Sequence, residues 1–212
     1  MKKVFLCVYL CFNILVNKHI LSQKIEIPEG YLLQYSQQFL KTSSINDYIT
    51  FFNNKLKLVS EKNNQFLRLL NNDTITPYPA LCILDNYIFG DFIFEFKARL
   101  KKSLIPEFHI VMSFKDTLNY YSIQLLFSTK DSINFKLIAN DRGQKIIKFD
   151  KTFNVKLKEW NEFVVVRELI DRSIKFYVNN KNNPIVVLND WSLVMGHIGF
   201  GIKNGVVDID DV

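Results

Sequence analysis

One stretch of strict alternation, residues 91–100, constrains the fold of this chain more than any other feature. Every second position is apolar: Phe92, Phe94, Phe96, Ala98 and Leu100. The intervening positions are mostly charged, with Glu95, Lys97 and Arg99 among them. A period of two is typical of a β-strand with one buried and one wet face, because a helix would scatter these side chains around its axis. The segment therefore predicts a half-buried strand.

The same pattern recurs along the rest of the chain. Residues 133–139, 163–169, 173–179 and 197–202 alternate in the same way, and 51–59 and 65–70 do so more weakly. Turn-forming residues separate these runs at 115–119, 140–143 and 179–184, and Asn204-Gly205 is typical of a type I′ hairpin turn. Many short strands with such separators favour an all-β sandwich or barrel. The one short helical turn we expect beyond the N-terminal segment is at 35–41.

The first 23 residues predict an export signal. Lys2 and Lys3 form a basic start, and residues 4–16 are apolar except for Asn13. This run is too short to cross a hydrocarbon core of about 30 Å as a helix, and it matches the apolar part of a signal peptide. Retention as an amphipathic anchor is the alternative. We expect a signal peptide at 1–23 and one domain at 24–212, exported to the periplasm, the cell surface or the medium, with no membrane span after signal removal.

The net charge limits which binding partners we expect, and the cysteine content limits which disulfides can form. The formal net charge is +6, and removing Lys2, Lys3 and Lys18 with the signal leaves +3. The remaining basic residues are scattered among acids, whereas nucleic-acid binding favours a concentrated basic stripe, so we expect no nucleic-acid partner. Of the three cysteines, Cys82 alone lies beyond the signal. Its apolar surroundings predict a buried thiol, with no internal disulfide.

Five motifs follow one another in the C-terminal half. They are residues 87–96 (YIFGDFIFEF), 120–125 (YYSIQL), 160–167 (WNEFVVVR), 174–180 (IKFYVNN), and 196–201 (GHIGFG) followed by 208–212 (DIDDV). Their order resembles that of the concanavalin A-like lectin/glucanase superfamily, in particular the laminin G-like jelly rolls. The resemblance implies a two-sheet antiparallel jelly-roll sandwich over most of the mature chain, and it is more specific for fold than for function.

Within that superfamily the chain is similar to a bacterial exported subgroup, the 3-keto-disaccharide hydrolase-like domains. Members that act on sugars carry carboxylates on the strand represented here by residues 120–127, in a pattern like Y-E-x-Q-x-x-D. Gln124 is kept, but Ser122 and Phe127 stand where the two acids would fall. Glycoside cleavage generally needs paired carboxyl groups. We therefore expect a non-catalytic module, without catalytic residues, that binds a glycan or an extracytoplasmic protein; the alternative is a glycoside-processing hydrolase or lyase.

The candidate ligand-binding residues would combine aromatic and polar side chains of several strands with Trp191, which we expect in a loop. They are Tyr120, Ser122, Gln124, Glu95, Arg99, Arg167 and Trp191. Aromatic rings contact the apolar face of a sugar, and polar groups contact its hydroxyls. This set requires crossing strands to bring Glu95 and Arg99 close to residues 120–127 or to Arg167. The alternative is that the charged face of 91–100 is the solvated back of a sheet.

The sequence predicts neither a cofactor nor a metal site. His109 and His197 lack a second His or Cys at ligand spacing, which argues against zinc. Asp208 and Asp210 share one face of the last strand, where we expect a solvated surface or turn bonding; catalysis by this pair is the alternative. Together with Asp211 they leave calcium as an alternative, because hard cations bind clustered oxygens.

Overall fold

The computed structural model describes residues 31–52, 55–71, 77–101, 106–129, 131–190, 192 and 194–212. The expected signal peptide at 1–23, the domain boundary at 24 and Trp191 lie outside the described residues. In the described ranges the chain forms two antiparallel sheets of seven strands each, which confirms the all-β sandwich. The helical structure there is the 3₁₀ helix Thr42–Asp47, which is not long enough or apolar enough to span a membrane.

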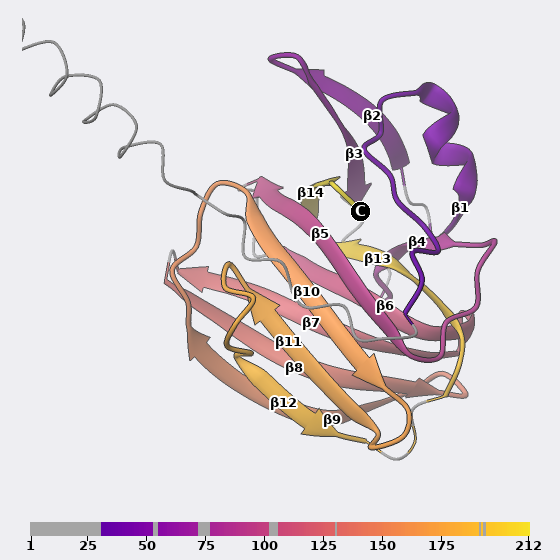
Figure 1. The fold of residues 1–212 in the computed structure, drawn as a ribbon, viewed down its shortest axis with the longest axis vertical. Helices are drawn as coiled ribbons and strands as arrows, with labels where there is room; N and C mark the ends of the chain where they lie inside the picture. Colours follow the sequence, from indigo (N-terminus) through magenta and orange to yellow (C-terminus); the bar gives the residue numbers. More distant parts are fainter. Residues whose placement is uncertain are drawn as a thin grey trace, which may run out of the picture.

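The two sheets lie face to face, and in Figure 1 strands β10, β11 and β12 lie in front of β7, β8 and β9. Sheet A contains, in spatial order, β1 (Tyr48–Phe51), β4 (Ala80–Leu84), β13 (His197–Lys203), β6 (Glu107–Asp116), β7 (Asn119–Thr129), β8 (Ser132–Asp141) and β9 (Gln144–Asn154). Sheet B contains β12 (Val186–Asn189), β11 (Ser173–Val178), β10 (Asn161–Glu168), β5 (Phe92–Lys101), β14 (Gly205–Asp210), β3 (Asn64–Asn71) and β2 (Lys55–Glu61).

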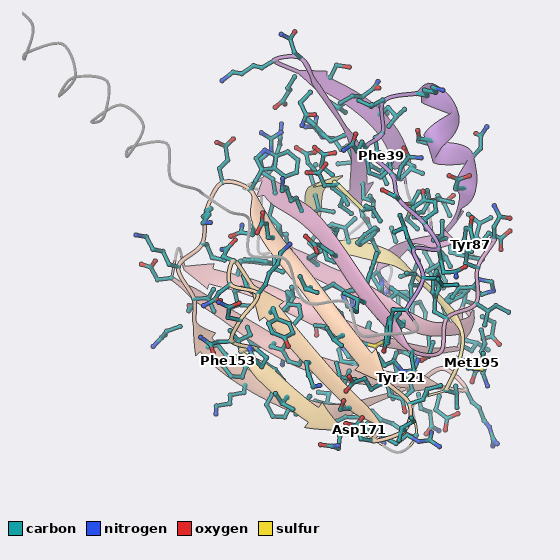
Figure 2. All side chains as sticks on the ribbon, in the orientation of Figure 1. Phe39, Tyr87, Tyr121, Phe153, Asp171 and Met195 are labelled. Carbon is teal, nitrogen blue, oxygen red and sulfur yellow. The ribbon has the colours of Figure 1, made fainter. Side chains whose placement is uncertain are left out.

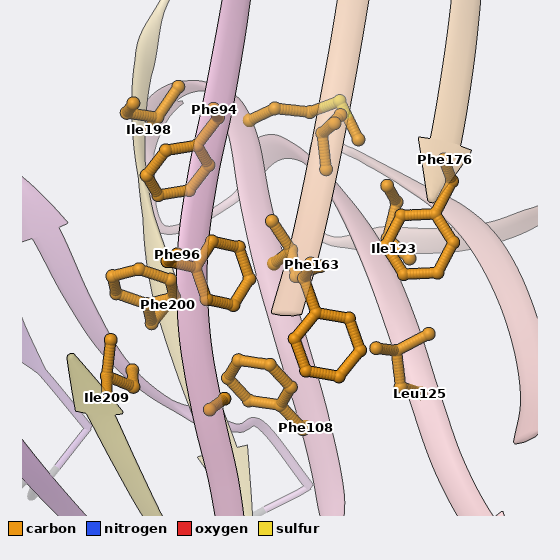
Figure 3. Close-up of a cluster of buried hydrophobic side chains, with 14 of the residues drawn as sticks. Phe94, Phe96, Phe108, Ile123, Leu125, Phe163, Phe176, Ile198, Phe200 and Ile209 are labelled. Carbon is orange, nitrogen blue, oxygen red and sulfur yellow. The ribbon is translucent and has the colours of Figure 1, made fainter. Parts of the chain in front are cut away.

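The core between the sheets contains many phenylalanine rings (Figure 3). Phe92, Phe94 and Phe96 on β5 are 5%, 6% and 0% exposed, so the predicted burial of this strand's apolar face is confirmed. The Phe96 ring centroid lies 4.9 Å from that of Phe200 on β13 and 5.5 Å from that of Phe163 on β10. Aromatic pairs at such separations stabilise a core beyond their buried area, by about 0.5–1.5 kcal/mol each. These rings therefore join the centres of the two sheets.

Asn204-Gly205 does not form the predicted hairpin. Asn204 has the expected left-handed backbone, with φ at 57°. However, β13 pairs with β4 and β6 in sheet A, whereas β14 pairs with β3 and β5 in sheet B. The chain thus crosses between sheets here, and a side chain at Gly205 would come within 2.6 Å of the Pro106 Cβ.

Of the other local predictions, one turn is confirmed and one helical turn is wrong. The turn at 140–143 is confirmed, because Arg142 and Gly143, with φ of 49° and 79°, link the paired strands β8 and β9. The predicted helical turn at 35–41 is wrong: Phe39 has a φ of 54°, and the short helix starts at Thr42 instead. The weak alternation over 51–59 belongs to two strands in different sheets, β1 and β2.

Candidate functional site

The structure separates the predicted ligand-binding residues into three places. Tyr120, Ser122 and Gln124 lie on the outer face of sheet A, because the alternate residues of β7, such as Ile123 and Leu125, fill the core. Arg167 belongs to the set of β10 residues that point between the sheets.

Glu95 and Arg99 lie on the outer face of sheet B, opposite the core-facing Phe94, Phe96 and Ala98. Packed sheets are about 10 Å apart, and their outer faces point away from each other. The structure therefore does not bring Glu95 and Arg99 to the residues of β7.

Arg99 is part of an ion network on sheet B. Its guanidinium bonds to Asp208 at 2.8 Å and Glu61 at 2.7 Å, and it lies over the rings of Phe66 and Trp160. Hydrogen bonds from Arg99 and then from Lys101 lower the pKa of Glu61 to about 2. The guanidinium of Arg99 is therefore engaged by other residues of the protein. Glu95 is similarly paired, with Lys181.

The aspartates of the last strand do not form a solvated face. Asp208 has no exposed surface and accepts hydrogen bonds from Arg68 and Arg99. Asp210, which is 7% exposed, accepts a bond from Asn64 at 2.8 Å, and Asp211 pairs with Lys97. Across the described ranges, no group of three or more His, Cys, Asp or Glu side chains gathers where it could hold a metal ion. The contacts of Asp208, Asp210 and Asp211 therefore indicate no site for calcium, and calcium binding stays a prediction.

The outer face of sheet A carries a set of polar side chains that we call the polar row: Glu107, His109, Gln124, Lys136 and Asp150. Register aligns four of them, since His109 is opposite Gln124, Gln124 is opposite Lys136, and Lys136 is opposite Asp150. The Gln124 amide donates to Glu107, and the Lys136 Nζ lies 2.8 Å from an oxygen of Asp150. The row thus spans four neighbouring strands, β6 to β9.

The side chains of the polar row differ in their exposure to solvent. The side chains of Glu107, Lys136 and Asp150 are 23%, 24% and 41% exposed and present charge to the solvent. His109 and Gln124 are each 4% exposed and lie beneath them. Gln124, the predicted residue of β7 in this row, is therefore buried beneath its neighbours. The accessible side chains, Glu107, Lys136 and Asp150, were not among the residues predicted from the sequence.

His109 has the least complete hydrogen bonding of the residues in the row. Its Nδ1 lies 3.4 Å from the Ser122 hydroxyl. Its Nε2 has no hydrogen-bond partner, and the closest Glu107 oxygen is 3.8 Å away. Burial lowers the pKa of His109, whereas the ring of His109 lowers the pKa of Glu107. A buried polar atom without a partner is costly, so Nε2 is a group that a hydroxyl or water would stabilise.

Beside the polar row, the same face is apolar. Leu81, Ile83, Val111, Phe114 and Tyr120 form a cluster that is separate from the main core, with Phe51 and Phe52 packed against it. Burial raises the pKa of Tyr120 to about 12. The five side chains of this cluster are buried, whereas Phe51 and Phe52 are half-buried and are the aromatic rings beside the row that solvent can reach.

The polar row does not place two carboxyl groups at catalytic separation. Glu107 is on β6 and Asp150 is on β9, with two strands between them. Three strand spacings of about 4.8 Å put the two backbones roughly 14 Å apart, beyond the approximately 5–9.5 Å that glycosidases use. Asp150 is also paired with Lys136. The backbones of Glu107 and Asp150 are therefore farther apart than the carboxyl groups of a glycosidase pair.

Comparison with known proteins identifies the fold. No family model matches the chain. No curated protein matches it in sequence either. Solved structures do match, and their shared architecture shows that the chain has the concanavalin A-like jelly-roll fold.

Three of these structures illustrate the likeness. The carbohydrate-binding module CBM66 from Bacillus subtilis has a TM-score of 0.59 and 12% identity, over 78% of this chain and 93% of that one. The β-glucanase of Bacillus licheniformis has a TM-score of 0.59 and 12% identity, over 84% and 94%. A legume lectin-like domain from Entamoeba histolytica has a TM-score of 0.60 and 12% identity, over 86% and 96%.

Proposed function

We propose that the chain is an exported carbohydrate-binding module that recognises its glycan through the polar row on the outer face of sheet A. The observation that carries this proposal is the row itself. The partly exposed charges of Glu107, Lys136 and Asp150 lie above the buried side chains of His109 and Gln124. The half-buried rings of Phe51 and Phe52 lie on the same face. The fold is shared with proteins described as a carbohydrate-binding module, a glucanase and a lectin-like domain.

Binding without catalysis is the simpler role for this site. A hydrolase of the keto-disaccharide type would need two carboxyl groups across the bond to be cleaved. Glu107 and Asp150 are three strand spacings apart, and Ser122 and Phe127 stand where the resemblance would place acids. Export is supported by the basic and apolar start of the sequence.

The test is a glycan-array screen of the full chain, followed by affinity measurements on variants. Lys136→Ala removes an accessible donor that pairs only with an exposed carboxylate. A hydrogen bond from a charged group contributes about 1.5–3 kcal/mol, so we expect at least a tenfold loss of affinity. Lys175→Ala is the matched control, because it removes a similarly exposed lysine from an ion pair with Glu168 on sheet B.

The proposal fails if the array detects no glycan, or if Lys136→Ala and Glu107→Ala leave the affinity unchanged. Equal losses in Lys136→Ala and Lys175→Ala would also contradict it, since the two lysines lie on opposite sheets.

A further inference from the structure

Arg167 is an arginine in the interior of the sandwich. It lies on β10 in register with Phe92 on β5 and Ile174 on β11, and it has no exposed surface. Arginine is rarely fully buried unless a carboxylate or another anion compensates its charge. Arg167 therefore requires an explanation that the polar row does not supply.

The described residues satisfy only part of this guanidinium. Nη1 donates to the Ser113 hydroxyl at 3.0 Å, whereas Nε and Nη2 have no hydrogen-bond partner. Asp91 is the acid whose charge most favours the cation, but one of its oxygens accepts a bond from the Leu169 amide. The charge of Arg172 opposes it, and burial lowers the pKa of Arg167.

The two unpartnered nitrogens are chemically matched. In a guanidinium, the N–H of Nε and one N–H of Nη2 point in parallel from the same edge. That edge binds the two oxygens of a carboxylate, phosphate or sulfate in a bidentate fashion. A single oxyanion would thus satisfy both donors and compensate the buried charge.

A surface hollow lies two contacts away from Arg167, through Ser113 and Val194. Ser113, which binds the guanidinium, donates to the Val194 carbonyl at 2.6 Å. Val194 lines an open hollow of about 410 Å³ together with Lys115, Leu169, Arg172 and Met195. Figure 2 shows Tyr121, Asp171 and Met195 at this end of the sandwich, where β10 ends.

We propose that the Nε/Nη2 edge of Arg167 binds an oxyanion, such as the carboxylate of an acidic sugar or a phosphate or sulfate group, which reaches it from this hollow. The site is distinct from the polar row and does not depend on the proposed glycan function. It assigns the chain a second, anion-specific binding position at the end of the sandwich.

The experiment measures the thermal unfolding midpoint of the full chain in sodium glucuronate, sodium phosphate and sodium sulfate. Glucose with sodium chloride at the same ionic strength is the reference, because glucose keeps the sugar ring of glucuronate and lacks its carboxylate. We expect one or more oxyanions to raise the midpoint, glucose with chloride to leave it unchanged, and Arg167→Met to abolish the rise. Arg142→Met, in the turn between β8 and β9, should preserve it.

Two results would overturn the inference: no oxyanion raises the midpoint, or the rise persists in Arg167→Met. If that variant does not fold, arginine-labelled NMR of the unsubstituted chain decides. Titration with an oxyanion should then shift the most exchange-protected arginine Nε–H signal, and an unmoved signal would likewise overturn the inference. Glucuronate against phosphate and sulfate distinguishes a sugar acid from an inorganic ion as the source.

Discussion

Arg99 and Asp208 occupy paired positions on β5 and β14, and their side chains form an ion pair with Nη2 and Oδ2 2.8 Å apart. Arg68, which is opposite Asp208 on β3, bonds to the same carboxylate. Asp208 has no exposed surface, while the Arg99 side chain is 12% exposed. One carboxylate therefore links three neighbouring strands of sheet B.

Replacing this carboxylate tests its role in stability. Asp208→Asn removes the buried charge partner of Arg68 and Arg99, both of which retain the more exposed Glu61. Breaking a buried pair in this way costs about 3 kcal/mol. Urea unfolding of the two proteins measures the difference. The control is Asp211→Asn, which breaks the more exposed pair with Lys97 and should cost below about 1 kcal/mol. Similar losses in both variants would show that Asp208 has no special role.

The backbone of the neighbouring strand β4 leaves no room for a side chain at Gly199. A Cβ at this position would overlap the carbonyl oxygen of Cys82 and lie 2.8 Å from the Ile83 Cα, both on the neighbouring strand β4. Because backbone atoms cannot move aside cheaply, Gly199→Ala should destabilise the fold by about 2 kcal/mol or more in urea unfolding. Gly90→Ala would meet side-chain atoms, the end of Leu169 at 3.0 Å and Met195 at 3.5 Å, and should cost clearly less. The reverse order would contradict this packing.

The buried ring of His109 makes stability depend on pH. Burial lowers its pKa in the folded state, while the unfolded chain keeps a value of about 6.5. As pH falls below about 6.5, the His109 ring becomes protonated in the unfolded state but not in the folded state. The free energy of unfolding therefore decreases progressively until the pH reaches the lower pKa of the folded state. The urea midpoint should therefore fall between pH 7.5 and 5.5.

In His109→Gln this fall should be smaller. Glu107, whose pKa is also lowered, does not contribute in this range, because its unfolded pKa is about 4.3. An identical pH dependence in the variant would assign the effect to other groups.

Much of the fold was predictable because alternation is a local property. It located β5, β8, β10, β11 and β13 and identified which side chains of β5 are buried. It did not reveal the partner of each strand. Asn204-Gly205 shows the limit, since its left-handed conformation was predictable whereas the crossing from sheet A to sheet B depends on distant strands.

The candidate site was less predictable for the same reason. Gln124 was selected from the sequence, but His109 and Lys136 become its neighbours only through the register of β6, β7 and β8. Alternation also cannot say that the charged side chains of β5 face away from β7. Glu95 and Arg99 were therefore grouped with residues of the opposite sheet.

The most direct test of glycan recognition by the polar row is NMR mapping of the full chain with the tightest-binding glycan from the array. Backbone amide shifts should concentrate on β6 to β9, around Glu107, Gln124, Lys136 and Asp150, and they should be absent from the outer face of sheet B. Shifts confined to sheet B, or to the end of the sandwich near Met195, would contradict recognition through the polar row.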